Sequence, residues 1–279
     1  MSTAVLINNY NNGTWLRACV DSVLTQTRPA DEIIVYDDGS TDDSVSILRS
    51  YGDSITLIAG LHDHSRHPRD SAFSAIYAAF EASSSEHLYL LDGDDFFFPE
   101  KIRLYEEAWA ARPELVLINA PMLRIDAAGL PLIEEREPKK HVSDHLAETY
   151  RVQDTDLYYW TSSLAFRREP LKRMLAASRQ SDPNLATDSR LAGIAPLYGT
   201  IATLNPILTA WRRLPHSLSH RFLTSLSKNL RARHSYFNYV ASQLGAARIH
   251  LWRNKEFYRG LARGIGLAPF YRLVRKRVI

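Results

Sequence analysis

Short apolar runs that end in polar turns alternate with segments of helical periodicity over the first 119 residues of the chain. Strand-type runs occupy residues 3–7, 32–36, 55–59, 87–91 and 115–119. Apolar residues at helical spacing predict helices at about 14–26, 45–48, 70–82 and 99–111. Strands that alternate with helices form parallel βαβ units, so the pattern predicts an α/β fold with a mostly parallel central sheet.

The pattern becomes less regular after residue 119. Residues 122–133 predict a β-hairpin that turns at Ala128 and Gly129, and the charged segment 134–156 predicts a loop with a short helix. The later elements are a strand that enters a helix at 160–168, a helix around 188–192, and strands near 199–204 and 207–211. Pro99 is expected in the first turn of the helix that ends near Ala111.

Composition places the chain among ordinary globular proteins. Of its 279 residues, 45% are hydrophobic and 23% are charged. The single cysteine, Cys19, excludes an intrachain disulfide, and its position on the apolar side of helix 14–26 favours a core role over a nucleophilic one. No apolar stretch reaches the roughly 20 residues of a membrane span, and the start lacks a basic signal region, so a cytoplasmic protein is expected.

Charge divides the chain near residue 212. Residues 212–279 hold 15 Lys and Arg residues against one acidic residue, Glu256, whereas the preceding residues hold 19 basic and 30 acidic ones. In the tail, aromatic and aliphatic residues recur at roughly helical intervals between the arginines. Basic helices with apolar sides suit an anionic membrane surface, although a helical subdomain that covers the sheet or forms a homodimer explains the pattern nearly as well. No segment resembles a nucleic-acid recognition module.

Three polar clusters follow predicted strands, at residues 8–12, 37–40 and 92–95. Open α/β sheets bind ligands at the carboxyl ends of their strands. The last cluster, Asp92-Gly93-Asp94-Asp95, crowds three carboxylates whose repulsion a bound cation would offset. Taken alone, it is more often a solvated acidic turn. Neither the Gly-x-Gly-x-x-Gly fingerprint nor a Gly-Lys-Ser/Thr phosphate loop is present, so a nucleotide would be bound in another way.

With these motifs in order, residues 3–219 resemble the family 2 glycosyltransferases, which have the GT-A fold. The resemblance rests on Asn8-Asn9-Tyr10-Asn11, Asp37-Asp38-Gly39-Ser40-Thr41-Asp42 and Asp92-Gly93-Asp94-Asp95 at these intervals. It implies an inverting, metal-dependent transferase domain at 1–219. The region 220–279, for which the charge and apolar pattern predicts basic helices, lies outside the resemblance. The implied reaction transfers a sugar from a UDP- or dTDP-linked donor to a glycan or lipid-linked acceptor in surface polysaccharide biosynthesis.

The resemblance also implies roles for donor-binding residues. Tyr10 would stack on the nucleotide base beside Asn8, and Asp38 would accept a hydrogen bond from a uracil or thymine imide, with Asp37 supporting the turn. Asp94 would be the principal ligand of Mn²⁺ or Mg²⁺, with Asp92 as a second ligand nearer the ribose. Gly93 belongs to the same donor-binding loop.

The remaining roles concern catalysis and the acceptor. Asp188 matches the general base of the family, although Thr187 replaces the Glu that usually precedes it, and a helix N-cap is the alternative role for Asp188. Arg213 and His216 would contact the diphosphate. Asp95 and Trp160 would lie on the acceptor side, or Asp95 would support the loop.

Two features depart from the family pattern or leave a choice open. Ser74 stands where the family often has Asn, and together with Thr187 it keeps a catalytically silent nucleotide-sugar binding or scaffold protein as the alternative function. The cluster of His62, His64 and His67 is compatible with a metal site, but a polar loop is the favoured interpretation because its spacing matches no metal motif.

Overall fold

The computed structural model describes residues 1–132, 141–143, 160–215, 235, 239, 240, 242 and 243. Within them an eight-stranded sheet has the order β3-β2-β1-β4-β9-β6-β10-β8. Its strands are β1 (Thr3–Asn9), β2 (Glu32–Asp37), β3 (Thr56–Ala59), β4 (His87–Asp92), β6 (Leu115–Asn119), β8 (His141–Ser143), β9 (Ala165–Arg167) and β10 (Thr200–Thr203). β9 runs antiparallel to β4 and β6, and β8 runs antiparallel to β10, while the other pairs are parallel. The predicted fold class, an α/β protein with a mostly parallel sheet, is therefore confirmed.

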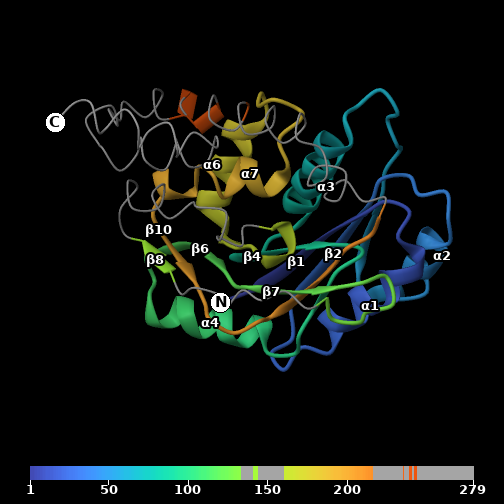
Figure 1. The fold of residues 1–279 in the computed structure, drawn as a ribbon, viewed down its shortest axis with the longest axis horizontal. Coiled ribbons are helices and arrows are strands. Elements are labelled where there is room, and N and C mark those ends of the chain that lie inside the picture. The colour runs from blue at the N-terminus through green and yellow to red at the C-terminus, as the bar shows by residue number, and fades with distance from the viewer. Residues whose placement is uncertain (133–140, 144–159, 216–234, 236–238, 241, 244–279) are drawn as a thin grey trace.

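Helices cover both faces of this sheet (Figure 1). They are α1 (Gly13–Leu24), α2 (Ser44–Arg49), α3 (Pro68–Ala82), α4 (Lys101–Ala111), α6 (Arg168–Ser178) and α7 (Thr187–Leu191), with short 3₁₀ turns η1 (Gly52–Ser54), η2 (Thr161–Ser163) and η3 (Ala195–Leu197). Alternate residues of β1 serve the two cores: Ala4 and Leu6 pack with α3, α6 and α7, whereas Val5 and Ile7 pack with α1, α2 and α4. Burial of both faces explains why the central strands are continuous apolar runs.

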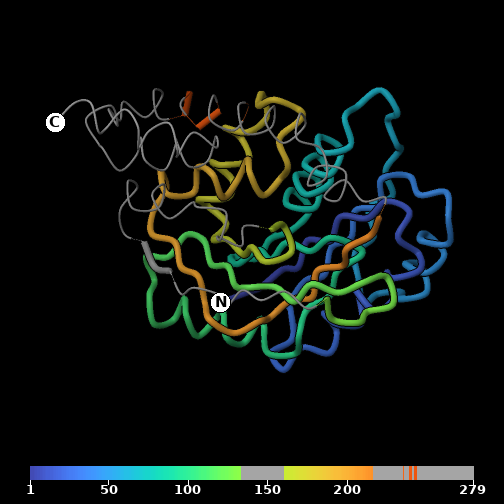
Figure 2. The backbone as a smooth tube through the Cα atoms, viewed as in Figure 1, coloured from blue at the N-terminus to red at the C-terminus, as the bar shows by residue number. Residues whose placement is uncertain are grey.

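A second sheet crosses the carboxyl end of the first and has the order β5-β11-β7. Its strands are β5 (Phe96–Phe97), β7 (Met122–Ile125) and β11 (Thr209–Arg212). β7 and β11 run side by side and parallel, as Figure 2 shows in green and orange. The predicted hairpin is present after β7: Asp126 N donates to Leu130 O at 2.9 Å, and Gly129 has a positive φ of 89°. The second sheet brings β11 next to the loop that follows β4.

Most predicted elements are confirmed with small shifts, and two details differ. Helix α4 begins at Lys101 after an N-cap at Glu100, so Pro99 precedes the helix and is not in its first turn. The strand predicted within 160–168 is limited to β9, because η2 precedes it. Cys19 is fully buried in the core, as expected. No helix in the described part of the chain is long and apolar enough to cross a membrane.

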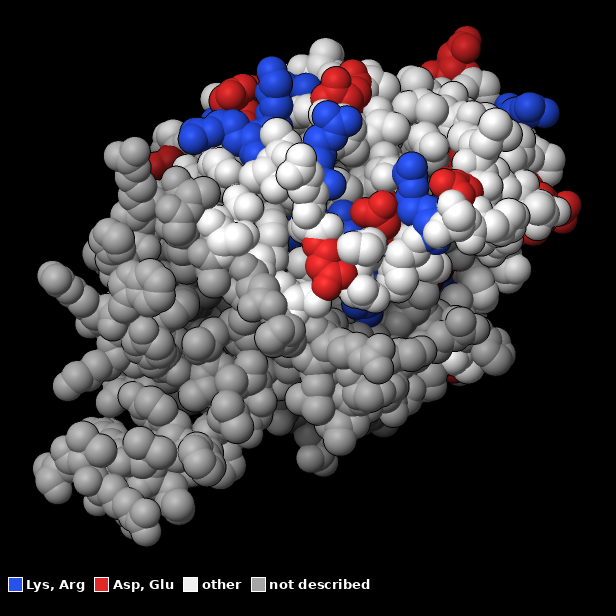
Figure 3. Space-filling model, turned by 90° about the horizontal axis from the view of Figure 1, so that it is seen from above, with Lys and Arg blue, Asp and Glu red and all other residues white. Residues whose placement is uncertain are grey.

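Most of the basic tail lies outside the described residues, including the division at residues 219 and 220. The described part includes Tyr239 and Val240, which are buried in the core beside α6 and α7. The Tyr239 hydroxyl lies 2.7 Å from Ser178 Oγ and donates to Arg190 O at 3.1 Å. On the face shown in Figure 3, the basic and acidic side chains of the described residues are interspersed and form no single-sign patch.

Candidate active site

The three predicted polar clusters meet at the carboxyl edge of the large sheet. β1 lies between β2 and β4, so Asn8 pairs with Asp92 on one side and Asn9 pairs with Asp37 on the other. Asn8 Nδ2 donates to Asp92 Oδ1 at 2.7 Å, and Asn9 Nδ2 donates to Asp37 Oδ2 at 2.7 Å. Side-chain hydrogen bonds therefore connect the carboxyl ends of β2, β1 and β4.

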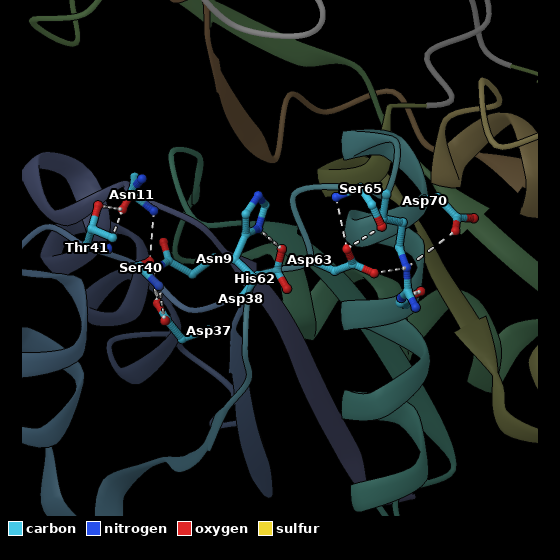
Figure 4. A network of polar contacts seen from close by, with 12 residues as sticks. Asn9, Asn11, Asp37, Asp38, Ser40, Thr41, His62, Asp63, Ser65 and Asp70 are labelled. Carbon is cyan, nitrogen blue, oxygen red and sulfur yellow. Dashed lines mark hydrogen bonds and ion pairs between the residues drawn. The ribbon is translucent and has the colours of Figure 1, made fainter.

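Asp37 shapes the turn after β2. Its buried carboxylate accepts hydrogen bonds from the Ser40 backbone N–H at 2.8 Å and from Ser40 Oγ at 2.7 Å, in addition to the bond from Asn9 (Figure 4). Gly39 has a φ of +70°, which an L side chain rarely adopts. These contacts fit the supporting role expected for Asp37 and leave Asp38 as the carboxylate that the turn presents to the site.

Tyr10 and Asp38 share one neighbour, His62, from the loop after β3. The Tyr10 and His62 rings are stacked with their centroids 4.1 Å apart, and Tyr10 is 38% exposed. His62 Nδ1 lies 2.7 Å from Asp38 Oδ2. An aromatic face and a carboxylate on the same side of the site can bind a planar ring that carries an N–H.

The Asp92–Asp95 loop is held close against β1. Gly93 N donates to Asn8 O at 2.9 Å, and a Cβ at Gly93 would lie 2.6 Å from Asn9 Oδ1, so only glycine fits there without movement. Burial raises the pKa of Asp92, and the neighbouring charge of Asp94 raises it further. Burial also raises the pKa of Asp94, while the Arg212 guanidinium opposes this shift. The two carboxylates thus gain stability from any nearby cation.

Asp95 differs from its two neighbours because it points into the protein. It is 2% exposed, its Oδ2 accepts from Ser162 Oγ at 2.5 Å, and its Oδ1 accepts from Arg212 N at 2.8 Å. Burial and the charges of Asp94 and Asp92 raise its pKa well above the usual range. These contacts fit the loop-supporting alternative, since contact with an acceptor would require Asp95 to release both partners.

Asp92 and Asp94 provide oxygen ligands of the kind that Mg²⁺ and Mn²⁺ prefer. Among the described residues, no group of three or more His, Cys, Asp or Glu side chains is arranged to hold a metal ion. A site with two carboxylates fits a cation whose other ligands are water and substrate phosphates, which is the usual way that Mg²⁺ is bound with nucleotides.

The histidine loop contributes three separate contacts instead of a metal site. His62 bonds to Asp38, and His64 packs its ring edge-on against His62 at 4.7 Å. His67 Nδ1 accepts from Arg69 N at 3.2 Å and caps the start of α3. The arrangement agrees with the polar-loop interpretation.

Asp188 lies in the first turn of α7, near the acidic loop. Ala186 is the N-cap of this helix, so the alternative role of Asp188 as the N-cap is wrong. Burial raises the pKa of Asp188 to about 6, although hydrogen bonds from Ser189 and the charge of Arg69 oppose the shift. The Asp188 charge in turn raises the pKa of Asp92, so the two carboxylates lie close enough to repel each other.

Arg190 fixes the position of α7. Its fully buried side chain donates to Asp70 Oδ1 at 2.9 Å and to Leu185 O at 3.0 Å, so α7 is tied to α3. Thr187, which replaces the expected Glu, is buried, and its hydroxyl has no hydrogen-bond partner among the described residues. Ser74 accepts from Arg66 Nη1 at 3.0 Å.

Trp160 and the end of β11 form the edge of the site near Asp95. Trp160 stacks on Trp211 with ring centroids 4.3 Å apart. Arg213 packs over the Trp211 ring, with 5.8 Å between its guanidinium carbon and the ring centroid. His216 lies outside the described residues.

Arg212, next to the predicted Arg213, contacts the acidic loop through its side chain. Its Nε donates to Asp94 O at 3.0 Å, and its Nη1 donates to Asp126 O and Ala127 O, each at 3.0 Å. Ser162 and His62 are further site residues that the sequence interpretation did not assign. The closest available signals were the position of Arg212 directly after the predicted strand 207–211, the position of Ser162 two residues after Trp160, and the place of His62 in the histidine cluster.

Solved structures of other proteins share this fold. The chain superposes on S. aureus TarS 1–349 in complex with UDP with a TM-score of 0.60 and 15% identity, covering 98% of this chain and 92% of that one. It superposes on the mannosyltransferase PcManGT from Pyrobaculum calidifontis, solved with GDP-Man and Mn²⁺, with a TM-score of 0.61 and 13% identity, covering 99% and 75% of the two chains. The fold is that of the GT-A glycosyltransferases.

Sequence comparison defines the family within this class. The sequence model of glycosyl transferase family 2 matches residues 4–175, which is more than half of the chain. The chain therefore belongs to glycosyl transferase family 2. An uncharacterized glycosyltransferase from Nostoc sp. (strain PCC 7120) is 26% identical over 273 residues, covering 93% of this chain and 82% of the relative. In several other curated glycosyltransferases, the match spans less than half of the relative's own length.

Proposed function

We propose that this family member is an inverting, metal-dependent transferase that takes a sugar from a UDP- or dTDP-linked donor. The main supporting observation is that Asn8 links β1 to Asp92 while the Asp188 charge acts on the same Asp92 carboxylate. The residues proposed to bind the sugar donor and the candidate base Asp188 thus lie at the same site in this proposal. TarS has been solved with UDP and with UDP-GlcNAc, and PcManGT with GDP-Man and Mn²⁺, which supports a nucleotide-sugar donor.

In this proposal, the residues at the ends of β1 and β2 hold the donor. Tyr10 stacks on the base, and Asp38 accepts its imide N–H, with Asn8 beside them. Gly93 lets the loop that carries Asp92 and Asp94 approach β1 closely. A divalent cation held by Asp94 and Asp92 would supply positive charge to the departing diphosphate. Arg213 and His216 remain proposed diphosphate contacts. The Arg212 guanidinium stabilises the ionised form of Asp94.

Asp188 is proposed to take the proton of the acceptor hydroxyl. A base with a pKa of about 6 is largely ionised at neutral pH and still accepts a proton more readily than an ordinary carboxylate does. Attack by the activated hydroxyl on the side opposite the leaving diphosphate inverts the configuration at the sugar carbon. Trp160 is proposed to contact the acceptor.

Replacing Asp94 tests the proposal. We expect Asp94→Asn to lose donor hydrolysis and transfer in the presence of Mn²⁺ while it keeps the melting temperature of the wild type or exceeds it, because the substitution removes a raised-pKa carboxylate. Chelation of the metal should give the same loss in the wild type. Unchanged turnover in the variant would refute the proposed metal site. Tight donor binding without turnover on any acceptor would favour the silent scaffold instead.

The acceptor and the tail complete the proposal. Basic helices in residues 220–279 would contact an anionic membrane surface and place the site near a glycan or lipid-linked acceptor of surface polysaccharide synthesis. The support is the charge pattern, with 15 basic residues and one acidic residue in positions 212–279. Sedimentation with vesicles of anionic lipid and with neutral vesicles tests this part, and salt-insensitive dimerisation without vesicle binding would favour a homodimer.

A further inference from the structure

His62 occupies both groups that the proposed function assigns to the nucleotide base. One face of its ring covers Tyr10 at a centroid distance of 4.1 Å with an interplanar angle of 13°. Its Nδ1 lies 2.7 Å from Asp38 Oδ2, and Figure 4 shows this contact between His62 and Asp38. The side chains of His62 and Asp38 are only 17% and 14% exposed. The imidazole is therefore a flat heteroaromatic ring that stacks on the tyrosine and donates an N–H to the carboxylate. A uracil imide offers the same two features.

A base cannot share this position with His62. A centroid distance of 4.1 Å is already contact distance, so no third ring fits between Tyr10 and His62. His62 shows which side of Tyr10 is within reach of Asp38, since one ring contacts both residues. A base that uses Tyr10 and Asp38 together must take the place of the imidazole.

The backbone around His62 is firmly packed against the turn after β2. Gly60 N donates to Asp37 O at 2.7 Å, and a Cβ at Gly39 would lie 2.6 Å from His62 N. Gly39 has a positive φ and lies next to Asp38, so the close approach of the two loops is built into the turn. Rotation of the His62 side chain about its own bonds is therefore a simpler way to free the site than movement of the loop.

We propose that His62 is a side-chain gate of the base site, which closes over Tyr10 and Asp38 and swings away when a nucleobase binds. This inference rests on the proposed base-binding role of Tyr10 and Asp38. Only molecules with an open gate bind the donor, so the apparent Kd equals the Kd of the open form divided by the fraction of open molecules. It also selects for bases, because a ligand must replace both the stacking contact and the hydrogen bond that His62 gives up.

The direction of the affinity change distinguishes a gate from an ordinary binding residue. Removing a gate tightens binding, whereas removing a residue that holds the base weakens it. With the gate closed in about nine molecules out of ten, His62→Ala lowers the Kd for UDP about tenfold. His62→Phe, which keeps the stacking on Tyr10 but loses the bond to Asp38, should fall between the wild type and His62→Ala.

Calorimetric titration of UDP with Mn²⁺ into the full chain tests the gate. Leu61→Ala is the matched control, since Leu61 precedes His62 and is 93% exposed, and its Kd should equal that of the wild type. UDP binding that His62→Ala weakens or leaves unchanged overturns the gate but keeps the base site. Failure of both the wild type and His62→Ala to bind UDP overturns the base site and the gate together.

Proton spectra of the histidine rings test the same movement without a substitution at the site. The His62 ring protons lie over the Tyr10 ring and are shielded by it, so the gate predicts that they shift downfield on addition of UDP. His62→Ala identifies the signal by its absence. A His62 signal that stays in place at saturating UDP overturns the gate, even if the affinity changes.

Discussion

Replacing Asp188 with Asn removes a negative charge from a half-buried position in the first turn of α7 and keeps the shape of the side chain. Burial raises the pKa of Asp188 from 3.8 to about 6, so the ionised carboxylate is less stable in the folded protein than in the unfolded chain. That difference corresponds to about 3 kcal/mol. Because solvent screens a half-buried group, we expect Asp188→Asn to raise the free energy of unfolding by about 1–3 kcal/mol at pH 8.

The pH dependence of this gain has a definite sign. Below pH 3.8, Asp188 is protonated in both states and costs nothing. The penalty grows as the pH rises through the interval between 3.8 and about 6, and it is complete above that interval. Urea denaturation of the wild type and Asp188→Asn should therefore show a small difference near pH 4.5 and the full difference at pH 8. An Asp188→Asn protein that is no more stable than the wild type at pH 8 would refute the raised pKa.

Activity should change in the opposite direction. Loss of a general base lowers turnover by about 10²–10⁴-fold. In the wild type, a base with a pKa of about 6 leaves kcat/KM at pH 5 about tenfold below its plateau, whereas a carboxylate with the ordinary pKa of 3.8 would lose less than about a tenth. Full turnover in Asp188→Asn would remove Asp188 from the mechanism.

Ser189→Ala separates Asp188 from the other carboxylates of the site. The Ser189 hydroxyl donates to Asp188 Oδ1 at 3.1 Å and lowers its pKa. Without that hydroxyl, the acid limb of the rate profile should move to higher pH. An acid limb that does not move would assign it to Asp92 or Asp94.

Two further substitutions test the construction of the site. Gly93→Ala places a Cβ 2.6 Å from Asn9 Oδ1, so we expect it to destabilise the fold by about 1–3 kcal/mol and to weaken UDP binding. Gly52→Ala is the contrasting control, because Gly52 has a φ of +52° but its Cβ would meet no atom within 4 Å, so it measures backbone strain without a steric contact. Ser162→Ala leaves the buried Asp95 Oδ2 without its hydrogen-bond donor, so we expect urea denaturation to show a free energy of unfolding lowered by about 1–3 kcal/mol. A loss no larger than that of the neighbouring Ser163→Ala would argue against the support of Asp95 by Ser162.

The central sheet could be predicted because each of its buried strands is a continuous apolar run in the sequence. β1, β2, β4 and β6 are covered on both faces, which requires continuous apolar runs that a reader of the sequence can find. β9 could be recognised only as a short strand, since its antiparallel insertion between β4 and β6 depends on partners far away in the chain. Ala165 pairs with Tyr89 and with Ile118, and no local pattern records either pairing.

The site residues divide in the same way. Asp38 and Asp94 stand in motifs directly after strands, so their position at the carboxyl edge follows from the parallel sheet. The contact of Arg212 could not be predicted from sequence, because Arg212 ends β11 and only the pairing of this strand with β7 and β5 brings its side chain to Asp94 O. The role of His62 could not be predicted from sequence, because its contacts with Tyr10 and Asp38 arise from the packing of two loops.

The arrangement around Asp95 shows how the fold tolerates four carboxylates at one edge. Lys101 is fully buried, and its Nζ donates to Ser162 O at 2.5 Å and to Thr209 Oγ1 at 2.7 Å. Burial lowers the pKa of Lys101 well below its usual range, and the Asp95 charge opposes this shift. Lys101 therefore holds the Ser162 backbone through its carbonyl oxygen, while the Ser162 hydroxyl donates to Asp95 Oδ2. Hydrogen bonds from Ser162 and the Arg212 backbone lower the pKa of Asp95, but burial still holds it well above its usual range, and the pKa values of Asp92, Asp94 and Asp188 are raised as well. The electrostatic cost of folding therefore falls on all four carboxylates, and the proposed cation and acceptor, which would contact Asp92, Asp94 and Asp188, would offset part of it by binding.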